Sequence, residues 1–171
     1  ITVAEITEQD GKWSIVKDSP YNRRITANSP MEITGPARGH AMMKTTADPS
    51  GVLALGTWNN CGNGQTPWGT YLTCEENFNG YFSSSDDAYQ PSSELNRYGV
   101  GNKDWGYAWA SVDDRFDISK NPNEPNRFGY VVEIDPLDPN STPKKRTALG
   151  RFKHENAELV VAENGHVVVY L

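Results

Sequence analysis

Apolar positions along this chain recur in short alternating stretches, and few stretches repeat them at helical spacing over the length of a helix. Short alternating runs that are bounded by glycine, proline and asparagine are typical of strands and turns. The order of these runs favours a meander of antiparallel strands and an all-β fold. The predicted strands cover residues 13–17, 52–58, 70–75, 130–134, 146–152, 159–162 and 166–170.

The last two predicted strands form the clearest hairpin. Glu163, Asn164 and Gly165 lie between them, and an Asn-Gly pair supplies the positive φ angles that tight hairpin turns require. The chain then stops inside the apolar run 166–171, without a closing turn, so we expect it to be a piece of a longer domain. Its first residues show no signal peptide, and no run approaches the roughly 18 apolar residues of a membrane helix.

Composition adds loops and one aromatic stretch to this picture. The 15 glycines and 11 prolines favour long connections, and we expect loops at residues 83–96 and 119–126. Residues 104–110 alternate large aromatic and small side chains, which puts Trp105, Tyr107 and Trp109 on one face if the backbone is extended. That face would either pack against a neighbouring sheet or stack on a sugar.

The charge balance restricts the partners. The net charge of −6 comes from 22 acidic and 16 basic residues, and the basic residues form no long cluster. Because affinity for the phosphate backbone depends on patches of lysine and arginine, we expect no nucleic-acid partner. A small phosphate ester stays possible, because bound cations can reverse the local field. The oligomeric state is not readable from the sequence.

The candidate chemistry gathers in residues 56–81, which hold the only two cysteines and a pair of glutamates. Cys61 and Cys74 lie thirteen positions apart, and in an exported protein they could form a disulfide. Either could also be a small buried residue. As metal ligands, a thiolate with carboxylate and amide oxygens suits an iron-type ion beside a hard, oxygen-loving ion better than it suits tetrahedral zinc.

Glu75 and Glu76 end a predicted strand, so their side chains leave on opposite faces while strand geometry persists. Both can join one metal cluster only if the strand ends there or if metals lie on both sides. Asn77 and Gly80 favour such an ending. The alternative is a pair of solvated glutamates before a loop, since glutamate is seldom buried without a partner.

A third group of polar residues lies in residues 150–157, with the sequence GRFKHENA. Its expected use is one inward metal ligand, Glu155, with Arg151 and Lys153 nearby to attract an anion. His154 is expected to be structural, and His40 and His166 to be structural or on the surface. No Ser-His-Asp signature, Walker loop, dinucleotide fingerprint or HExxH occurs.

Five segments together resemble the PhoX-type alkaline phosphatases, in order and over nearly the whole chain. They are SPYNRRITA at residues 19–27, GPARGH at 35–40, the run from GTWNNC to TPWGTYLTCEEN at 56–77, FGYVVEIDP at 128–136 and GRFKHE at 150–155.

The resemblance implies a six-bladed β-propeller, of which residues 1–171 would be an incomplete part holding roughly the first blades. It implies hydrolysis of phosphomonoesters at a cluster of ferric (Fe³⁺) and calcium (Ca²⁺) ions, with a metal-bound oxo group or water as the nucleophile. It also implies export by the twin-arginine route to the periplasm or the outside of a bacterium. On the matching motifs, Cys61 and Glu155 would bind iron, Glu75 and Glu76 would serve the iron–calcium cluster, and Asn59 and Asn60 would belong to the surrounding shell.

Two departures limit this comparison, and one alternative stays open. Asn156 stands where the family pattern leads us to expect glycine, and the chain stops before the later blades that supply further carboxylates and arginines in the family. The alternative is an extracytoplasmic β-rich module that binds calcium or carbohydrate without catalysis. In that module Cys61 would be a disulfide partner or an inert core residue.

Overall fold

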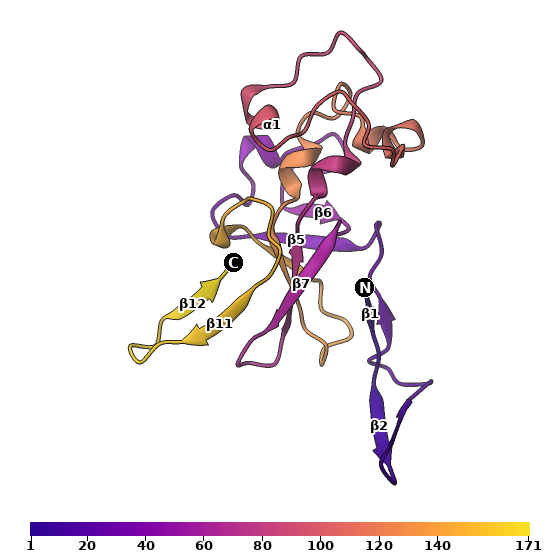
Figure 1. Cartoon of the computed structure of the whole chain (residues 1–171), viewed down its shortest axis with the longest axis vertical. Helices are drawn as coiled ribbons and strands as arrows, with labels where there is room; N and C mark the ends of the chain where they lie inside the picture. Colours follow the sequence, from indigo (N-terminus) through magenta and orange to yellow (C-terminus); the bar gives the residue numbers. More distant parts are fainter.

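The computed structural model describes residues 1–171 and is built mainly from β-strands, as the sequence predicts. Six strands form one sheet in the order β6-β5-β10-β9-β8-β7, and its neighbouring loops and short helices gather at one end of the molecule (Figure 1). The strands of this sheet are β5 (Pro30–Thr34), β6 (Leu53–Leu55), β7 (Asn60–Gln65), β8 (Tyr71–Glu75), β9 (Val131–Ile134) and β10 (Lys144–Arg146).

The predicted antiparallel meander is correct for part of this sheet. Strands β7, β8, β9 and β10 follow one another as antiparallel neighbours, but β10 then pairs with β5 in parallel, with Lys145 opposite Ile33. A parallel pair needs a long connection, and the residues that join here are far apart in the sequence. Local patterns therefore give no signal for this pairing.

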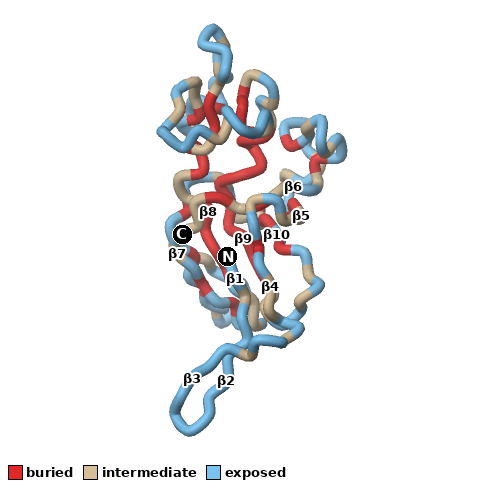
Figure 2. The backbone as a smooth tube through the Cα atoms, turned by 90° about the vertical axis from the view of Figure 1, so that its right-hand side faces the viewer, coloured by how far each residue is buried: buried red, intermediate tan, exposed pale blue.

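Three pairs of short strands lie outside the main sheet. The hairpin of β11 (Glu158–Val161) and β12 (Val167–Tyr170) confirms the predicted one, although only Gly165 of its turn has a positive φ, at 81°. The hairpin of β2 (Ile6–Gln9) and β3 (Lys12–Ile15) extends away from the body and is exposed along its length (Figure 2). Strand β1 (Thr2–Val3) pairs with β4 (Arg23–Arg24).

Some local predictions were wrong. The strand predicted at residues 146–152 ends at Arg146, because Thr147–Leu149 forms a 3-10 helix whose first hydroxyl donates to the Thr34 carbonyl. The loop predicted at residues 83–96 contains the start of helix α1 (Ser93–Arg97), which Ser92 caps by accepting a hydrogen bond from the Leu95 amide at 3.3 Å. Strand β7 was missed, since its sequence NCGNGQ lacks the β-branched and aromatic residues typical of strands.

The core consists of three apolar clusters, two with members on the sheet strands and one formed largely by residues of the loops and short helices. Figure 2 shows buried backbone both in the sheet and among the loops. The loop cluster is rich in aromatic rings, and Trp58 meets Phe116 edge-on at 5.0 Å between ring centroids. Its buried members are Trp58, Phe78, Phe82, Leu95, Val100, Phe116, Ile118 and Phe128.

The aromatic stretch at residues 104–110 is not extended, so the prediction of one aromatic face is wrong. Gly106 has φ +97° and Ala108 has φ +58°, and a 3-10 helix starts at Trp109. The Trp109 ring packs on Trp58 at 4.9 Å, while Trp105 stays half exposed. The backbone thus separates the rings, and no aligned platform for a sugar forms.

The segment 154–157 crosses over β7 and β8 at very short range. The His154 amide donates to the Glu75 carbonyl at 3.2 Å, and the Gly62 amide donates to the Glu155 carbonyl at 2.5 Å. A Cβ atom on Gly62 or Gly64 would collide with the carbonyl oxygen of Glu155 or Ala157. The two glycines therefore allow this crossing.

None of the helices is long and apolar enough to span a membrane.

We predict that Gly64→Ala destabilises the fold, because its methyl group would occupy the position of the Ala157 carbonyl. The expected loss in the free energy of unfolding is about 3 kcal/mol, as for an overpacked site. Gly101→Ala is the matched control, since nothing lies within 4 Å of the added methyl group. Urea denaturation measures both, and equal stability of the two variants would contradict the assignment.

Candidate metal centre

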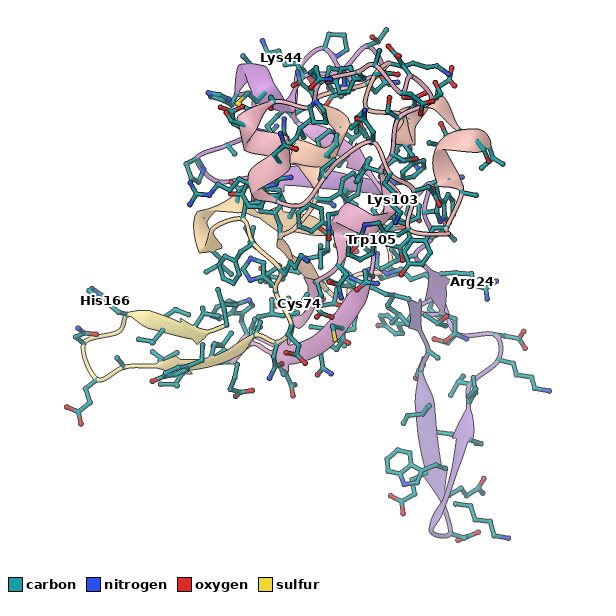
Figure 3. All side chains as sticks on the ribbon, turned by 45° about the horizontal axis from the view of Figure 1, so that its top comes forward. Arg24, Lys44, Cys74, Lys103, Trp105 and His166 are labelled. Atoms are coloured by element: carbon teal, nitrogen blue, oxygen red, sulfur yellow. The ribbon has the colours of Figure 1, made fainter.

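A β-bulge sets the position of Cys61. The register of β7 and β8 shifts between the pairs Asn60–Glu75 and Asn63–Thr73, so that Cys61 and Gly62 face only Cys74. Such a bulge bends the strand and redirects a side chain. Cys61 is exposed and Cys74 is fully buried; Figure 3 labels Cys74. Both are free thiols, and no disulfide joins them in this structure.

Asn59 fastens the end of β8 to the start of β7. It has a left-handed backbone with φ +49°, its carbonyl accepts from the Glu76 amide at 3.1 Å, and its side-chain oxygen accepts from the Asn77 amide at 3.0 Å. The Asn60 side chain donates to the Thr57 hydroxyl at 2.8 Å. Both asparagines therefore shape the backbone that carries Cys61 and Glu76.

Cys61, Glu76 and Glu155 are brought together by this arrangement. The pKa of the Cys61 thiol is raised, first by its hydrogen bond to Glu76, then by desolvation and by the negative charges of Glu76 and Glu155, while the Gly62 backbone acts in the opposite direction. A bound cation would offset this local excess of negative charge, and a thiol with two carboxylates is a suitable donor set for an iron-type ion. No group of three such side chains is arranged to hold a metal ion by itself.

Glu75 points into the core, away from this group. Its carboxylate is fully buried and accepts hydrogen bonds from Lys145 Nζ at 2.7 Å and from the amides of Trp58, Gly129 and Tyr130 at 3.3, 3.0 and 3.1 Å. These four donors occupy both oxygens, so we leave Glu75 out of the candidate site.

Lys145 is the cation of this buried pair. Burial lowers its pKa, and the Coulomb attraction and hydrogen bond of Glu75 counteract that shift. Its ammonium group also lies 3.8 Å from the centre of the Phe128 ring, a cation–π contact. No motif in the sequence marked Lys145, because its partner is 70 residues away.

The two cations predicted beside Glu155 have different surroundings. Arg151 donates through Nε to the Phe128 carbonyl at 2.8 Å and through Nη2 to the Pro125 carbonyl at 2.7 Å. Lys153 is exposed, and its ammonium lies 5.7 Å from the ring of Trp105, which Figure 3 also labels. Lys153 is thus the freer of the two to meet an anion.

The histidines take structural positions, as expected. His154 is fully buried, its ring lies 3.7 Å from the Phe152 ring, and its Nε2 pairs with the Gly150 carbonyl at 3.2 Å. Desolvation lowers its pKa, so the ring is neutral near pH 7. Its other ring nitrogen, Nδ1, is buried without a hydrogen-bond partner. His40 accepts a hydrogen bond from the Met42 amide, and His166 is exposed.

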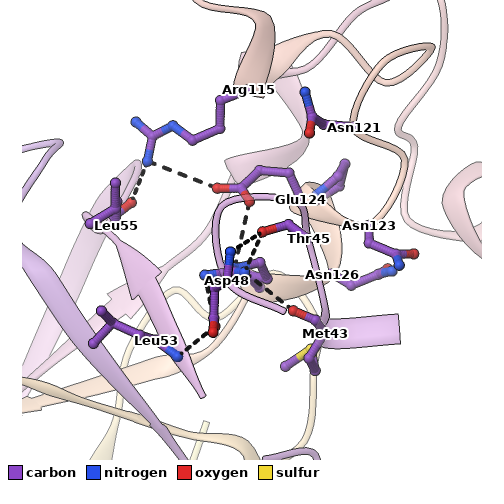
Figure 4. Close-up of polar contacts among 12 residues, drawn as sticks. Met43, Thr45, Asp48, Leu53, Leu55, Arg115, Asn121, Asn123, Glu124 and Asn126 are labelled. Carbon is purple, nitrogen blue, oxygen red and sulfur yellow. Dashed lines mark hydrogen bonds and ion pairs between the residues drawn. The ribbon is translucent and has the colours of Figure 1, made fainter. Parts of the chain in front are cut away.

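A second charged cluster, which the sequence did not indicate, joins the loop after Met43 to the residues around Glu124 (Figure 4). Arg127 lies 3.5 Å from both Asp48 and Glu124, and Glu124 lies 3.8 Å from Arg115. Asp48 also accepts hydrogen bonds from the amide of Leu53, the first residue of β6, at 2.8 Å and from the amide of Val52 at 2.9 Å. These charges are paired with one another, so the cluster fastens loops to the sheet.

This mainly β-stranded chain presents an exposed thiol near two carboxylates at a strand bulge, and these are donor types that metal ions use. The family model described as alkaline phosphatase PhoX matches residues 1–171. This chain belongs to the PhoX family, as its motifs suggested.

One solved structure similar to this chain is "Pseudomonas fluorescens PhoX in complex with vanadate, a transition state analogue". The two are 57% identical with a TM-score of 0.96, and the match covers 99% of this chain and 29% of that one. This chain therefore spans less than a third of the length of that protein. No curated protein sequence matches this chain.

We predict that Lys145→Met destabilises the protein by about 3–5 kcal/mol, because it leaves the Glu75 carboxylate buried without its cation. Lys144→Met is the matched control in the same strand, since Lys144 is exposed and forms no ion pair. Thermal or urea unfolding measures the difference. A Lys145→Met variant as stable as the control would show that the pair contributes little.

We predict that Cys61 in metal-free protein reacts with iodoacetamide slowly at pH 8. The thiolate is the nucleophile, and the raised pKa of Cys61 reduces its fraction. Glu76→Gln removes the carboxylate that causes most of the shift, so the pKa falls and the rate at pH 8 rises. Mass spectrometry identifies the alkylated cysteine, and Cys74 stays unmodified while the fold is intact, because it is buried with a pKa raised to about 11. An unchanged rate in Glu76→Gln would contradict the assignment.

Proposed function

We propose that this chain is part of an alkaline phosphatase that hydrolyses phosphomonoesters. The observation that carries the proposal is the meeting of Cys61, Glu76 and Glu155 at the bulge of a PhoX-family chain. The similar Pseudomonas fluorescens protein was solved with vanadate, described as a transition state analogue, and its 57% identity over nearly all of this chain supports the same reaction class. The substrate is therefore a small phosphate ester.

We assign the metals to an iron–calcium cluster, with Cys61 and Glu155 as iron ligands and Glu76 serving the cluster. When bound, Fe³⁺ and Ca²⁺ would supply Lewis acidity that stabilises charge on the phosphate oxygens and on the departing alkoxide. The chemistry of the donors supports this assignment, since Glu76 and Glu155 both raise the pKa of the Cys61 thiol and neither takes part in an ion pair of the structure. This chain corresponds to 29% of the similar Pseudomonas fluorescens protein. Further metal ligands would come from the rest of the complete protein.

The residues of this chain prepare the site in three ways. Glu76 raises the pKa of the Cys61 thiol, and the thiol proton must leave before the sulfur can bind a cation, so metal affinity rises with pH. Asn59 and Asn60 hold the backbone that leads into Cys61 through hydrogen bonds with Asn77 and Thr57. Lys153, two residues before Glu155, offers a cation to the phosphate.

The propeller and the location belong to the same proposal. We place residues 1–171 in a six-bladed β-propeller domain, of which they would form roughly the first blades, and the all-β structure together with the PhoX family supports this. We also expect twin-arginine export to the periplasm or the outside of a bacterium. Folding around metals before transport fits that route.

We predict that the complete protein contains iron and calcium and hydrolyses p-nitrophenyl phosphate, and that a calcium chelator abolishes the hydrolysis. Glu155→Gln should reduce both iron content and kcat by at least the roughly 10–100-fold that even outer residues of metal sites cost. Glu158→Gln is the matched control, because that exposed glutamate lies three residues away outside the cluster.

Elemental analysis and steady-state kinetics provide the two readouts. Cys61→Ala should lose iron together with activity. Full activity in Cys61→Ala, or protein that carries no iron, would contradict the metal assignment.

A further inference from the structure

A basic groove lies between the end of helix α1 and the segment 151–153. It encloses about 630 Å³. Its charged members are Arg97, Arg151 and Lys153, and no carboxylate lines it. The remaining lining residues are Asn96, Tyr98, Gly99 and Phe152.

The three cations of this groove are unpaired. None of them takes part in any of the ion pairs of the structure, although the chain carries a net charge of −6 and has more acidic than basic residues. Three unpaired cations around one cavity raise the local potential and attract anions.

Arg151 is held rigidly at the base of the groove. Two backbone carbonyls accept from its Nε and Nη2, and its guanidinium lies 4.0 Å from the ring centre of Tyr98 and 5.0 Å from that of Phe78. Neither of these two hydrogen bonds uses its third nitrogen, Nη1. A guanidinium that is already fixed in place loses little entropy when it binds an oxyanion.

The groove adjoins the candidate metal centre through Lys153. Lys153 lies two residues before Glu155, and both are exposed on either side of the buried His154, so at most about 7 Å of backbone separates them. An anion at Lys153 and a phosphate at the metal centre are therefore within the length of one small substrate.

We infer that this groove binds a second phosphate group of the substrate, so that the enzyme prefers esters that carry two phosphates. The inference rests on the proposed function, in which the first phosphate is the one hydrolysed. Arg97 and Lys153 approach the second phosphate from the exposed sides of the groove, and Arg151 approaches it from the base.

Steady-state kinetics with a matched pair of substrates tests the inference. Fructose 1,6-bisphosphate and fructose 6-phosphate differ by one phosphate, and the complete protein should show a kcat/KM about tenfold higher for the bisphosphate. Arg97→Gln should lower this ratio about fivefold, while Arg97→Lys retains most of it, because the charge persists. Arg24→Gln, an exposed arginine of β4 outside the groove and without an ion pair, should leave the ratio unchanged. Figure 3 labels Arg24.

A binding measurement separates this inference from the proposed function. Isothermal titration of the chelator-treated complete protein with pyrophosphate should show binding that weakens about fivefold in Arg97→Gln and not in Arg24→Gln. If the protein hydrolyses neither ester, the proposed function fails. The titration still shows whether the groove binds a phosphate group. Equal affinity for pyrophosphate in the wild type and in Arg97→Gln would overturn the inference. The same ratio of the two kcat/KM values, bisphosphate to monophosphate, in both proteins would also overturn it.

Discussion

The buried pair of Glu75 and Lys145 is the interaction on which the rest of this structure depends. Its two charges lie 2.7 Å apart with no exposed surface, and the carboxylate also accepts from three backbone amides. A charge in such a position is tolerated only when it is paired and hydrogen-bonded. The pair thereby joins β8, which carries Glu75, to β10, which carries Lys145. The amide hydrogen bonds to Glu75 also hold the residues just before β9 and the residue Trp58 before β7.

This pair also decides which glutamate can serve the site. Since strand residues alternate between faces, fixing Glu75 in the core turns Glu76 to the opposite side, where it meets Cys61. The bulge in β7 then supplies the thiol, and the segment that crosses over Gly62 supplies Glu155. The end of β8 thus carries two adjacent glutamates with different roles. Glu75 belongs to the buried ion pair, and Glu76 belongs to the candidate site near the exposed Cys61.

Much of the fold and part of the site could be predicted from the sequence, and the limits have a physical cause. The strands made of short apolar runs between turn residues, such as β8, β9 and the final hairpin, were predictable because that signal is local. Strand β7 was not, because glycine and asparagine carry no strand preference and its ladder with β8 stabilises it. Among the site residues, Glu75 was expected to serve the metal cluster because the family resemblance covers both glutamates, and the sequence does not reveal that Lys145 lies beside Glu75.

The sequence by itself determined the all-β class, the family resemblance and the three segments that carry Cys61, Glu76 and Glu155. These depend on residue types and short spacings, which the chain displays directly. Only the tertiary structure decided that Glu75 belongs to the core, that Cys61 rather than Cys74 is exposed, and that Arg97 lies beside Lys153. Each of these depends on contacts between residues far apart in the chain, and burial, which follows from such contacts, determines whether a polar group is structural or free to bind.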